Sequence, residues 1–189
     1  MSIEKLKATA SKARGFASAN QFVVTLPSLG RYDTNDLNVL CSNVNMPGRQ
    51  ILTAERLYGI KGRKMPNGFA SDDVNMTFYV MNDYMIKKYF EDWQESIISQ
   101  DTHEIAYAST YCRDVRIAQL QKGKSFDFPI DRIFGINIDL DIATRESIVY
   151  ETKLLDAFPT TMNSIELNNE LDGLVQLQVQ LSYRNWERV

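Results

Sequence analysis

The strongest constraint on the fold is a two-residue alternation that runs through residues 173–186. Apolar residues occupy every second position, and the residues between them are polar. The apolar set is Val175, Leu177, Val179, Leu181 and Tyr183, and the polar set is Gln176, Gln178, Gln180, Ser182 and Arg184. Successive side chains of a strand point to opposite faces, so this pattern predicts one long β-strand with Val175, Leu177, Val179 and Leu181 in the core.

The polar face of this strand is unusual because Gln176, Gln178 and Gln180 carry no charge. Solvent-facing strands are more often lined by Lys, Glu and Thr. A neutral polar face indicates either pairing with another chain or a lining past which something slides without sticking.

Further segments alternate in the same way or are rich in β-branched and aromatic residues. Strands are expected at 21–26, 36–44, 72–81, 112–121 and 136–142, and residues 147–155 are expected to be extended until Pro159 ends them. Residues 50–64 are expected to be extended, with bends at Gly59 and Gly62, and residues 65–68 (Met-Pro-Asn-Gly) to form a turn.

Two segments have helical spacing instead. From Asn82 onward, apolar residues recur every three or four positions, and Ile86, Phe90, Trp93 and Ile97 are predicted to pack one face of a helix against the core. Asn82 or Asp83 is the expected cap. A short, weakly amphipathic helix is expected at 2–13, within an N-terminal arm of about residues 1–19. The sum is a single mainly β domain over 1–189, a sandwich or partly closed barrel with one flanking α-helix.

Composition narrows the function. The 189 residues are 44% hydrophobic, and 21 basic residues against 24 acidic ones give a net charge of −3, which argues against a dedicated duplex DNA binder. No apolar run reaches bilayer length and no signal peptide is evident, so we expect a protein without a membrane anchor that is made in a cytoplasm. Cys41 and Cys112 are expected to be small buried hydrophobes.

Few residues of the sequence are candidates for a catalytic or metal-binding site. His103 is expected in a surface loop, without the Ser or Cys pattern that a triad needs. Asp139 and Asp141 share one face of a predicted strand and could hold a divalent ion, but an ordinary amphipathic strand explains them equally. Residues 59–62 (Gly-Ile-Lys-Gly) only superficially match a nucleic-acid-clamping loop. We therefore expect no catalytic residue, no metal site and no cofactor.

Charge is distributed unevenly along the chain. Residues 49–64 contain one acidic residue, Glu55, and five basic residues, Arg49, Arg56, Lys61, Arg63 and Lys64. Residues 127–156 hold seven acids, Asp127, Asp131, Asp139, Asp141, Glu146, Glu151 and Asp156, against three basic residues. Two solvated faces explain this pattern, and so do complementary patches on neighbouring copies of the chain.

Several blocks resemble the tail tube proteins of contractile-tailed bacteriophages. They are residues 15–22 (Gly-Phe-Ala-Ser-Ala-Asn-Gln-Phe), residues 78–83 (Phe-Tyr-Val-Met-Asn-Asp) followed by 90–94 (Phe-Glu-Asp-Trp-Gln), and 157–159, 165–167 and 179–186. Together they span about residues 15–187. Segments 34–36, 50–70 and 122–150 look longer or more divergent than in a minimal member of the family.

The resemblance implies a structural virion protein that is assembled in the host cytoplasm. Homohexameric rings would stack into a tube inside the tail sheath, with baseplate and tail terminator proteins at its ends and tape-measure protein and genome DNA in its lumen. Gln176, Gln178 and Gln180 would then face the lumen, and the basic loop from Arg49 to Lys64 would reach an adjacent ring.

Three other functions compete with this one. Within the same fold the alternatives are a baseplate-proximal tube initiator and a type VI secretion-like tube protein. From a different class, the alternative is a nucleic-acid-binding module, which predicts salt-sensitive binding by the monomer.

Overall fold

The computed structural model describes residues 2–12, 16–121, 148–165, 167 and 173–189. The strand expected at 136–142, the possible metal ligands Asp139 and Asp141 and most of the acidic stretch lie outside the described residues. The elements, in chain order, are α1 (Ile3–Lys12), β1 (Phe22–Thr25), α2 (Thr34–Val39), β2 (Cys41–Val44), β3 (Gln50–Tyr58), β4 (Lys61–Ala70), β5 (Val74–Tyr79), α3 (Met85–Glu95), α4 (Ala108–Tyr111), β6 (Arg113–Leu120), β7 (Ile148–Met162), β8 (Gln176–Ser182) and β9 (Asn185–Arg188).

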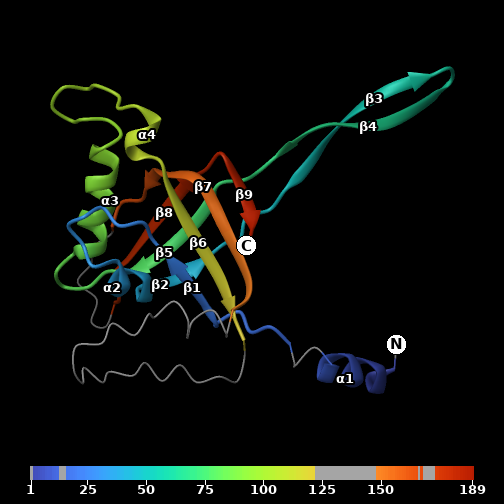
Figure 1. Cartoon of the computed structure of the whole chain (residues 1–189), viewed down its shortest axis with the longest axis horizontal. Coiled ribbons are helices and arrows are strands. Elements are labelled where there is room, and N and C mark those ends of the chain that lie inside the picture. The colour runs from blue at the N-terminus through green and yellow to red at the C-terminus, as the bar shows by residue number, and fades with distance from the viewer. Residues whose placement is uncertain (1, 13–15, 122–147, 166, 168–172) are drawn as a thin grey trace.

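The main sheet is antiparallel and curls into a partly closed barrel (Figure 1). Its strand order is β1-β6-β7-β8-β5-β2, and β9 pairs with β7 beside this path. The first half of β7 pairs with β6 and β9, whereas its last residues, from Phe158 to Met162, pair with β8. One strand thus belongs to both halves of the barrel, and the mainly β fold expected from the alternating patterns is confirmed.

The prediction that Pro159 ends the seventh strand is wrong, because β7 continues to Met162. Pro159 lies opposite Leu181 on β8, and the pairing of β7 with β6 has already stopped at Ala157. At Pro159 the strand therefore has an open side, where a residue without an N–H can sit. A register shift follows directly, between Pro159 and Thr161.

The interior of the barrel is one apolar cluster that α3 helps to close. The alternating residues of β5 and β8 enter it, with Val74, Met76, Phe78, Leu177, Val179 and Leu181 all at most 1% exposed. From α3 come Ile86, Tyr89, Phe90 and Trp93, each fully buried. The cap expected at Asn82 or Asp83 is instead Tyr84, which has a left-handed φ of 56° and no side-chain cap hydrogen bond. Asp83, one residue earlier, accepts a hydrogen bond from the Met85 amide at 3.1 Å.

The strand expected at 36–44 is only half correct, since residues 34–39 form the short helix α2. The side chain of Asp33 accepts from the Asn35 amide at 3.0 Å and so caps the helix. Leu37 is fully buried, and the Asn38 side chain accepts from the Leu26 amide at 2.8 Å. These local contacts outweigh the alternation, and extended chain begins at Cys41.

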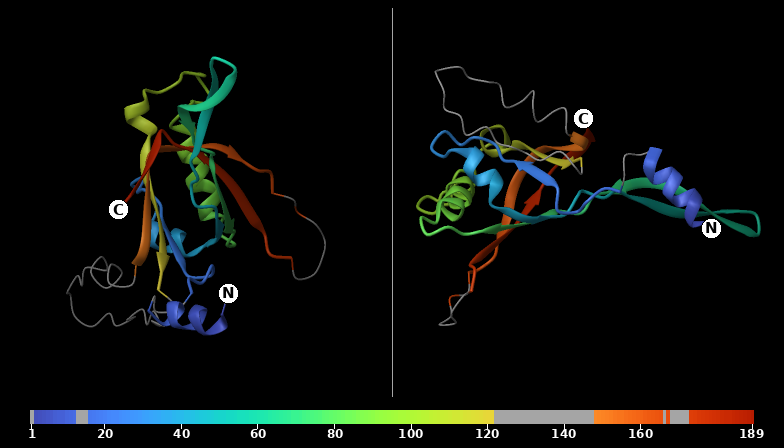
Figure 2. Two further views of the ribbon diagram at one scale, coloured as in Figure 1. Left: turned by 90° about the vertical axis from the view of Figure 1, so that its right-hand side faces the viewer. Right: turned by 90° about the horizontal axis from the view of Figure 1, so that it is seen from below.

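The segment 50–70 forms a separate two-stranded hairpin that projects from the barrel (Figure 2). Its turn is Gly59–Ile60, where Gly59 has φ +65°, a conformation that costs glycine little. The turn expected at 65–68 is wrong, because these residues lie within β4. Pro66 pairs with Thr53 beside a register shift, and a two-stranded hairpin leaves the other edge of β4 free to accommodate proline.

The C-terminal alternation forms two strands rather than one. β8 ends at Ser182, the chain turns at Tyr183 and Arg184, and β9 then pairs with residues 152–155 of β7. The Arg184 amide donates to the Leu155 carbonyl at 3.1 Å, which ties the turn to β7.

Candidate assembly surfaces

The glutamine face of β8 is part of a wider neutral polar surface. Gln176 and Gln178 are exposed and Gln180 is half-buried, and they pair across the sheet with Tyr79, Thr77 and Asn75 of β5. The Gln178 side chain accepts a hydrogen bond from Asn163 at 2.7 Å, and the Gln180 side chain donates to the Asp73 carboxylate at 3.0 Å. Neighbouring side chains therefore hold two of the three glutamines, Gln178 and Gln180.

The opposite face of β8 is dry. Leu177, Val179 and Leu181 have no exposed area, whereas Val175 precedes the strand and is only half-buried. On α3, the structure places Ile86, Phe90 and Trp93 in the core. It places Ile97 beyond the end of the helix, half-buried, since the helix stops at Glu95.

Two buried hydrogen-bonding groups of α3 escaped the sequence argument. The Tyr89 hydroxyl donates to the Pro27 carbonyl at 2.6 Å, and the Trp93 indole donates to the Tyr111 carbonyl at 2.8 Å. The acceptors are main-chain oxygens distant in sequence, so no residue pattern marks them. Desolvation by burial raises the pKa of Tyr89, which keeps its hydroxyl a donor.

The hairpin β3–β4 exposes apolar side chains over its whole length. Ile51 is 64% exposed, Leu57 77% and Phe69 57%, and Ile60 at the turn is completely exposed. An isolated two-stranded hairpin is marginally stable in water. Side chains of this kind on a projecting arm indicate a surface that another protein covers.

The basic residues expected on this segment do not act as one group. Arg56 lies directly opposite Arg63 and near Lys61, so one face of the tip is cationic. Lys64 lies opposite Glu55. In the described part of the chain, none of these four cations lies within ion-pair distance of a carboxylate, and like charges directly opposite each other are unfavourable. Arg49 is separate, at the base of the hairpin, against the rings of Phe69 and Trp186.

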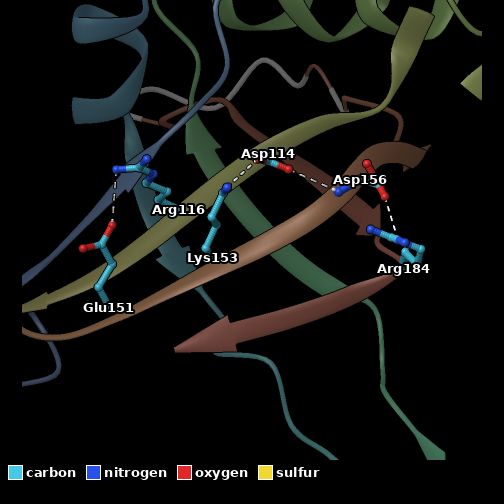
Figure 3. A network of polar contacts seen from close by, with 6 residues as sticks. All are labelled: Asp114, Arg116, Glu151, Lys153, Asp156 and Arg184. Carbon is cyan, nitrogen blue, oxygen red and sulfur yellow. Dashed lines mark hydrogen bonds and ion pairs between the residues drawn. The ribbon is translucent and has the colours of Figure 1, made fainter. Parts of the chain in front are cut away.

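A charged network surrounds the corner where β7 passes from one half of the barrel to the other (Figure 3). Asp156 takes a left-handed φ of 54° at a bulge, where β7 has two residues, 155 and 156, between the partners of Val115 and Arg113, and β6 has only one residue between them. Asp156 pairs with Arg184 at 2.6 Å. Its amide donates to Asp114 at 3.4 Å, and Asp114 pairs with Lys153 at 2.7 Å.

The hydrogen bonds that Asp114 accepts stabilise its ionised form. The hydrogen bond from Lys153, helped by that from the Asp156 amide, lowers the pKa of Asp114 against a smaller opposing effect of burial. A third pair, Arg116 with Glu151 at 3.7 Å, lies farther along β6 and β7. Asp114 is therefore ionised at neutral pH, and its contacts with Lys153 and the Asp156 amide tie β6 to the corner of β7.

The remaining reactive groups are two thiols and one imidazole, and Cys112 lies near Asp156 and Arg184. Cys41 and Cys112 are free thiols that are half-buried, not fully buried as expected, and burial raises the pKa of Cys41 to about 12. His103 is exposed in a loop. Within the described ranges there is no group of three or more His, Cys, Asp or Glu side chains placed to hold a metal ion. None of the helices there is both long and apolar enough to span a bilayer.

Solved structures share this fold over nearly the whole chain. A chain in the sheath–tube complex of an extracellular contractile injection system, PVC, in the extended state has a TM-score of 0.59 and 14% identity, with 100% of this chain and 98% of that one covered. A chain in the tube-terminating cap of the anti-feeding prophage has a TM-score of 0.61 and 14% identity, covering 92% and 91%. A chain in the baseplate of the same prophage has a TM-score of 0.58 and 11% identity, covering 92% and 95%.

The chain is thus a mainly β protein that shares its fold with chains of contractile injection particles and has a projecting apolar hairpin and a neutral polar sheet face. The sequence profile described as phage tail tube protein matches residues 13–189. The chain belongs to the phage tail tube protein family. Among curated proteins, no sequence matches it.

Proposed function

We propose that the chain forms hexameric rings that stack into the inner tube of a contractile tail, the conduit through which genome DNA passes into the host. Membership of the tail tube family supports the role as a tube subunit. The projecting hairpin is the main structural observation in favour of self-assembly. Leu57 and Ile60, at its far end, expose 77% and 103% of their area, which is unfavourable unless another subunit covers them.

The open ends of the main sheet support the ring. β1 and β2 are the last strands of the path, so each has an edge of backbone donors and acceptors that no strand of the described residues pairs with. Pairing of the β1 edge of one subunit with the β2 edge of the next is a head-to-tail contact, and head-to-tail contacts close into rings when the rotation per subunit allows it. Six copies would then continue the sheet around a lumen.

The neutral face of β8 suits the lining of that lumen. Lysines at the positions of Gln176, Gln178 and Gln180 would hold DNA phosphates, and glutamates would repel them. Glutamine stays hydrated and does neither. The hydrogen bonds from Asn163 and to Asp73 keep two of these side chains on the wall and out of the passage.

The partners follow from the same proposal. The related chains come from particles with a sheath, a cap and a baseplate. We infer corresponding partners here: a tail sheath protein outside the tube, baseplate and terminator proteins at its ends, and a tape-measure protein with DNA inside. The protein would be assembled in the host cytoplasm and reside in the virion, with the cationic tip of the hairpin contacting an acidic surface of an adjacent ring.

Electron microscopy of the purified chain tests the assembly. We expect six-fold rings or hollow tubes for the wild type, and unassembled, folded protein when Leu57 and Ile60 are both replaced by Ser. Ile105→Ser removes a comparably exposed apolar side chain (73%) from the loop before α4 and serves as the matched control. Single rings without stacking would favour a tube initiator. A compact monomer that binds nucleic acid in a salt-sensitive way would favour the nucleic-acid-binding module.

A further inference from the structure

At the base of the hairpin, the cation of Arg49 lies against two aromatic rings. The guanidinium carbon of Arg49 lies 5.2 Å from the centre of the Phe69 ring and 4.8 Å from that of Trp186. Arg49 directly precedes β3, Phe69 lies near the end of β4, and Trp186 belongs to β9. One cation thus joins both strands of the hairpin to the C-terminal strand of the barrel.

Two hydrogen bonds reinforce this junction. Arg49 donates from Nη2 to Oδ1 of Asn185 at 3.4 Å, and the Trp186 indole donates to the carbonyl of Gly48 at 3.2 Å. Both join the segment that enters β3 to β9. Strand β9 is itself anchored on β7 through pairs such as Leu154 with Trp186. The junction therefore connects the base of the hairpin, through β9, to strand β7 of the barrel.

Besides this junction, the linker after β4 is held at its far end, where the Gln180 side chain donates to Asp73 at 3.0 Å and the Tyr183 hydroxyl donates to the Asp72 carbonyl at 2.9 Å. Among the residues that the structure describes, β3 and β4 form a sheet of their own, without ladder hydrogen bonds to the barrel. Residues 45–49 and 71–73, which link them to β2 and β5, lie outside regular structure. A two-stranded arm on such linkers is free to swivel unless side chains hold it.

We propose that Arg49, held between Phe69 and Trp186, is a positioning residue that sets the direction of the hairpin before any partner binds. Preorganising an arm reduces the entropy lost when it docks, so the contact lowers the concentration needed for assembly. This last consequence rests on the proposed function, whereas the fixed direction of the arm does not.

The test measures the arm directly. Spin labels are attached at Ile60→Cys on the hairpin turn and Lys88→Cys on α3, in a chain carrying Cys41→Ala and Cys112→Ala, at a concentration where light scattering shows monomers. Pulsed electron resonance then gives the distribution of label-to-label distances. We expect a narrow distribution with Arg49 and a broad one for Arg49→Met, with Arg49→Lys intermediate because it keeps the cation but loses the bond to Asn185.

The control removes a similar contact elsewhere on the same strand. Arg188 of β9 lies 5.7 Å from the ring centre of Tyr150, a residue of β7, so this cation–ring pair contains no residue of the hairpin. Arg188→Met should leave the distribution narrow. Circular dichroism verifies that each variant is folded, and Trp186→Phe, which keeps a ring but loses the bond to Gly48, provides a second perturbation expected to broaden the distribution.

Two results would overturn the inference: a distribution for Arg49→Met as narrow as for the parent, or equal broadening for Arg188→Met. Assembly is measured separately with unlabelled protein. There we expect Arg49→Met to raise the concentration for half-maximal assembly by about fivefold, the scale of exposed cation–π contacts. A wild type that never assembles would refute the proposed function and leave the distance result standing.

Discussion

Replacing Val179 by Asp tests whether β8 presents the face to the core that the structure shows. Val179 has no exposed area and lies directly across from Met76 on β5 and Met162 on β7. In the described part of the chain, the only buried polar residue is Thr152, so an introduced carboxylate has no partner. Losing the valine contacts costs about 2 kcal/mol.

The larger cost depends on pH. Burial raises the pKa of the introduced carboxyl, so it is neutral in the folded state but ionised in the unfolded state at pH 7. The unfolded state is therefore favoured increasingly as pH rises above about 3.9, by about 1.4 kcal/mol per pH unit, or ~4 kcal/mol between pH 4 and pH 7. With the lost contacts, the penalty reaches ~6 kcal/mol, comparable to the total stability of many domains (about 5–15 kcal/mol).

Urea unfolding followed by tryptophan fluorescence measures the effect, at one fixed protein concentration for all variants. Val179→Asn is the uncharged control and should lose no more stability at pH 7 than at pH 4. Gln178→Asp places the same carboxyl one residue away on the polar face and should cost little. If Val179→Asp at pH 7 is within about 1 kcal/mol of Gln178→Asp, the assignment of the two faces is wrong.

Three further predictions address the surfaces. Gln178→Lys should fold normally but slow DNA ejection, and a normal infectious yield would argue that Gln178 does not line the lumen. Asp114→Asn should reduce acid sensitivity: the lowered pKa of Asp114 contributes stability above its unfolded value and loses it as pH falls through the folded one, so urea midpoints of the parent and the variant should converge at low pH and differ at neutral pH. Arg56→Glu together with Arg63→Glu should weaken assembly and reverse its dependence on salt concentration, measured by light scattering. An unchanged salt dependence would show that the hairpin tip does not bind an acidic surface.

Much of the barrel could be predicted because alternation reports the two faces of a strand directly. On that basis alone the sequence predicts the burial of Leu177, Val179 and Leu181, and the structure shows all three fully buried. The errors fall where a local pattern was overruled by contacts distant in sequence. Asn38 looks like a polar strand position until its side chain is seen to accept from Leu26.

The other errors concern proline and strand ends. Pro66 and Pro159 look like terminators, yet both lie in strands that have an open side, a property of the sheet and not of the tripeptide around them. The break after Ser182 has a similar cause, since residues 185–188 pair with β7, which no alternation reveals. Within the candidate surfaces, sequence grouped Arg49 with the basic residues of the hairpin, whereas its aromatic partners come from segments far along the chain.

The shared strand β7 has a mechanical consequence. Its residues from Ile148 to Met162 pair first with β6 and β9 and then with β8, so a single covalent backbone runs through both halves of the barrel. A pull applied to either half is transmitted to the other along that backbone, and not only through side chains that can slide. The pulling force would follow the bend of β7 at Asp156, which pairs with Arg184.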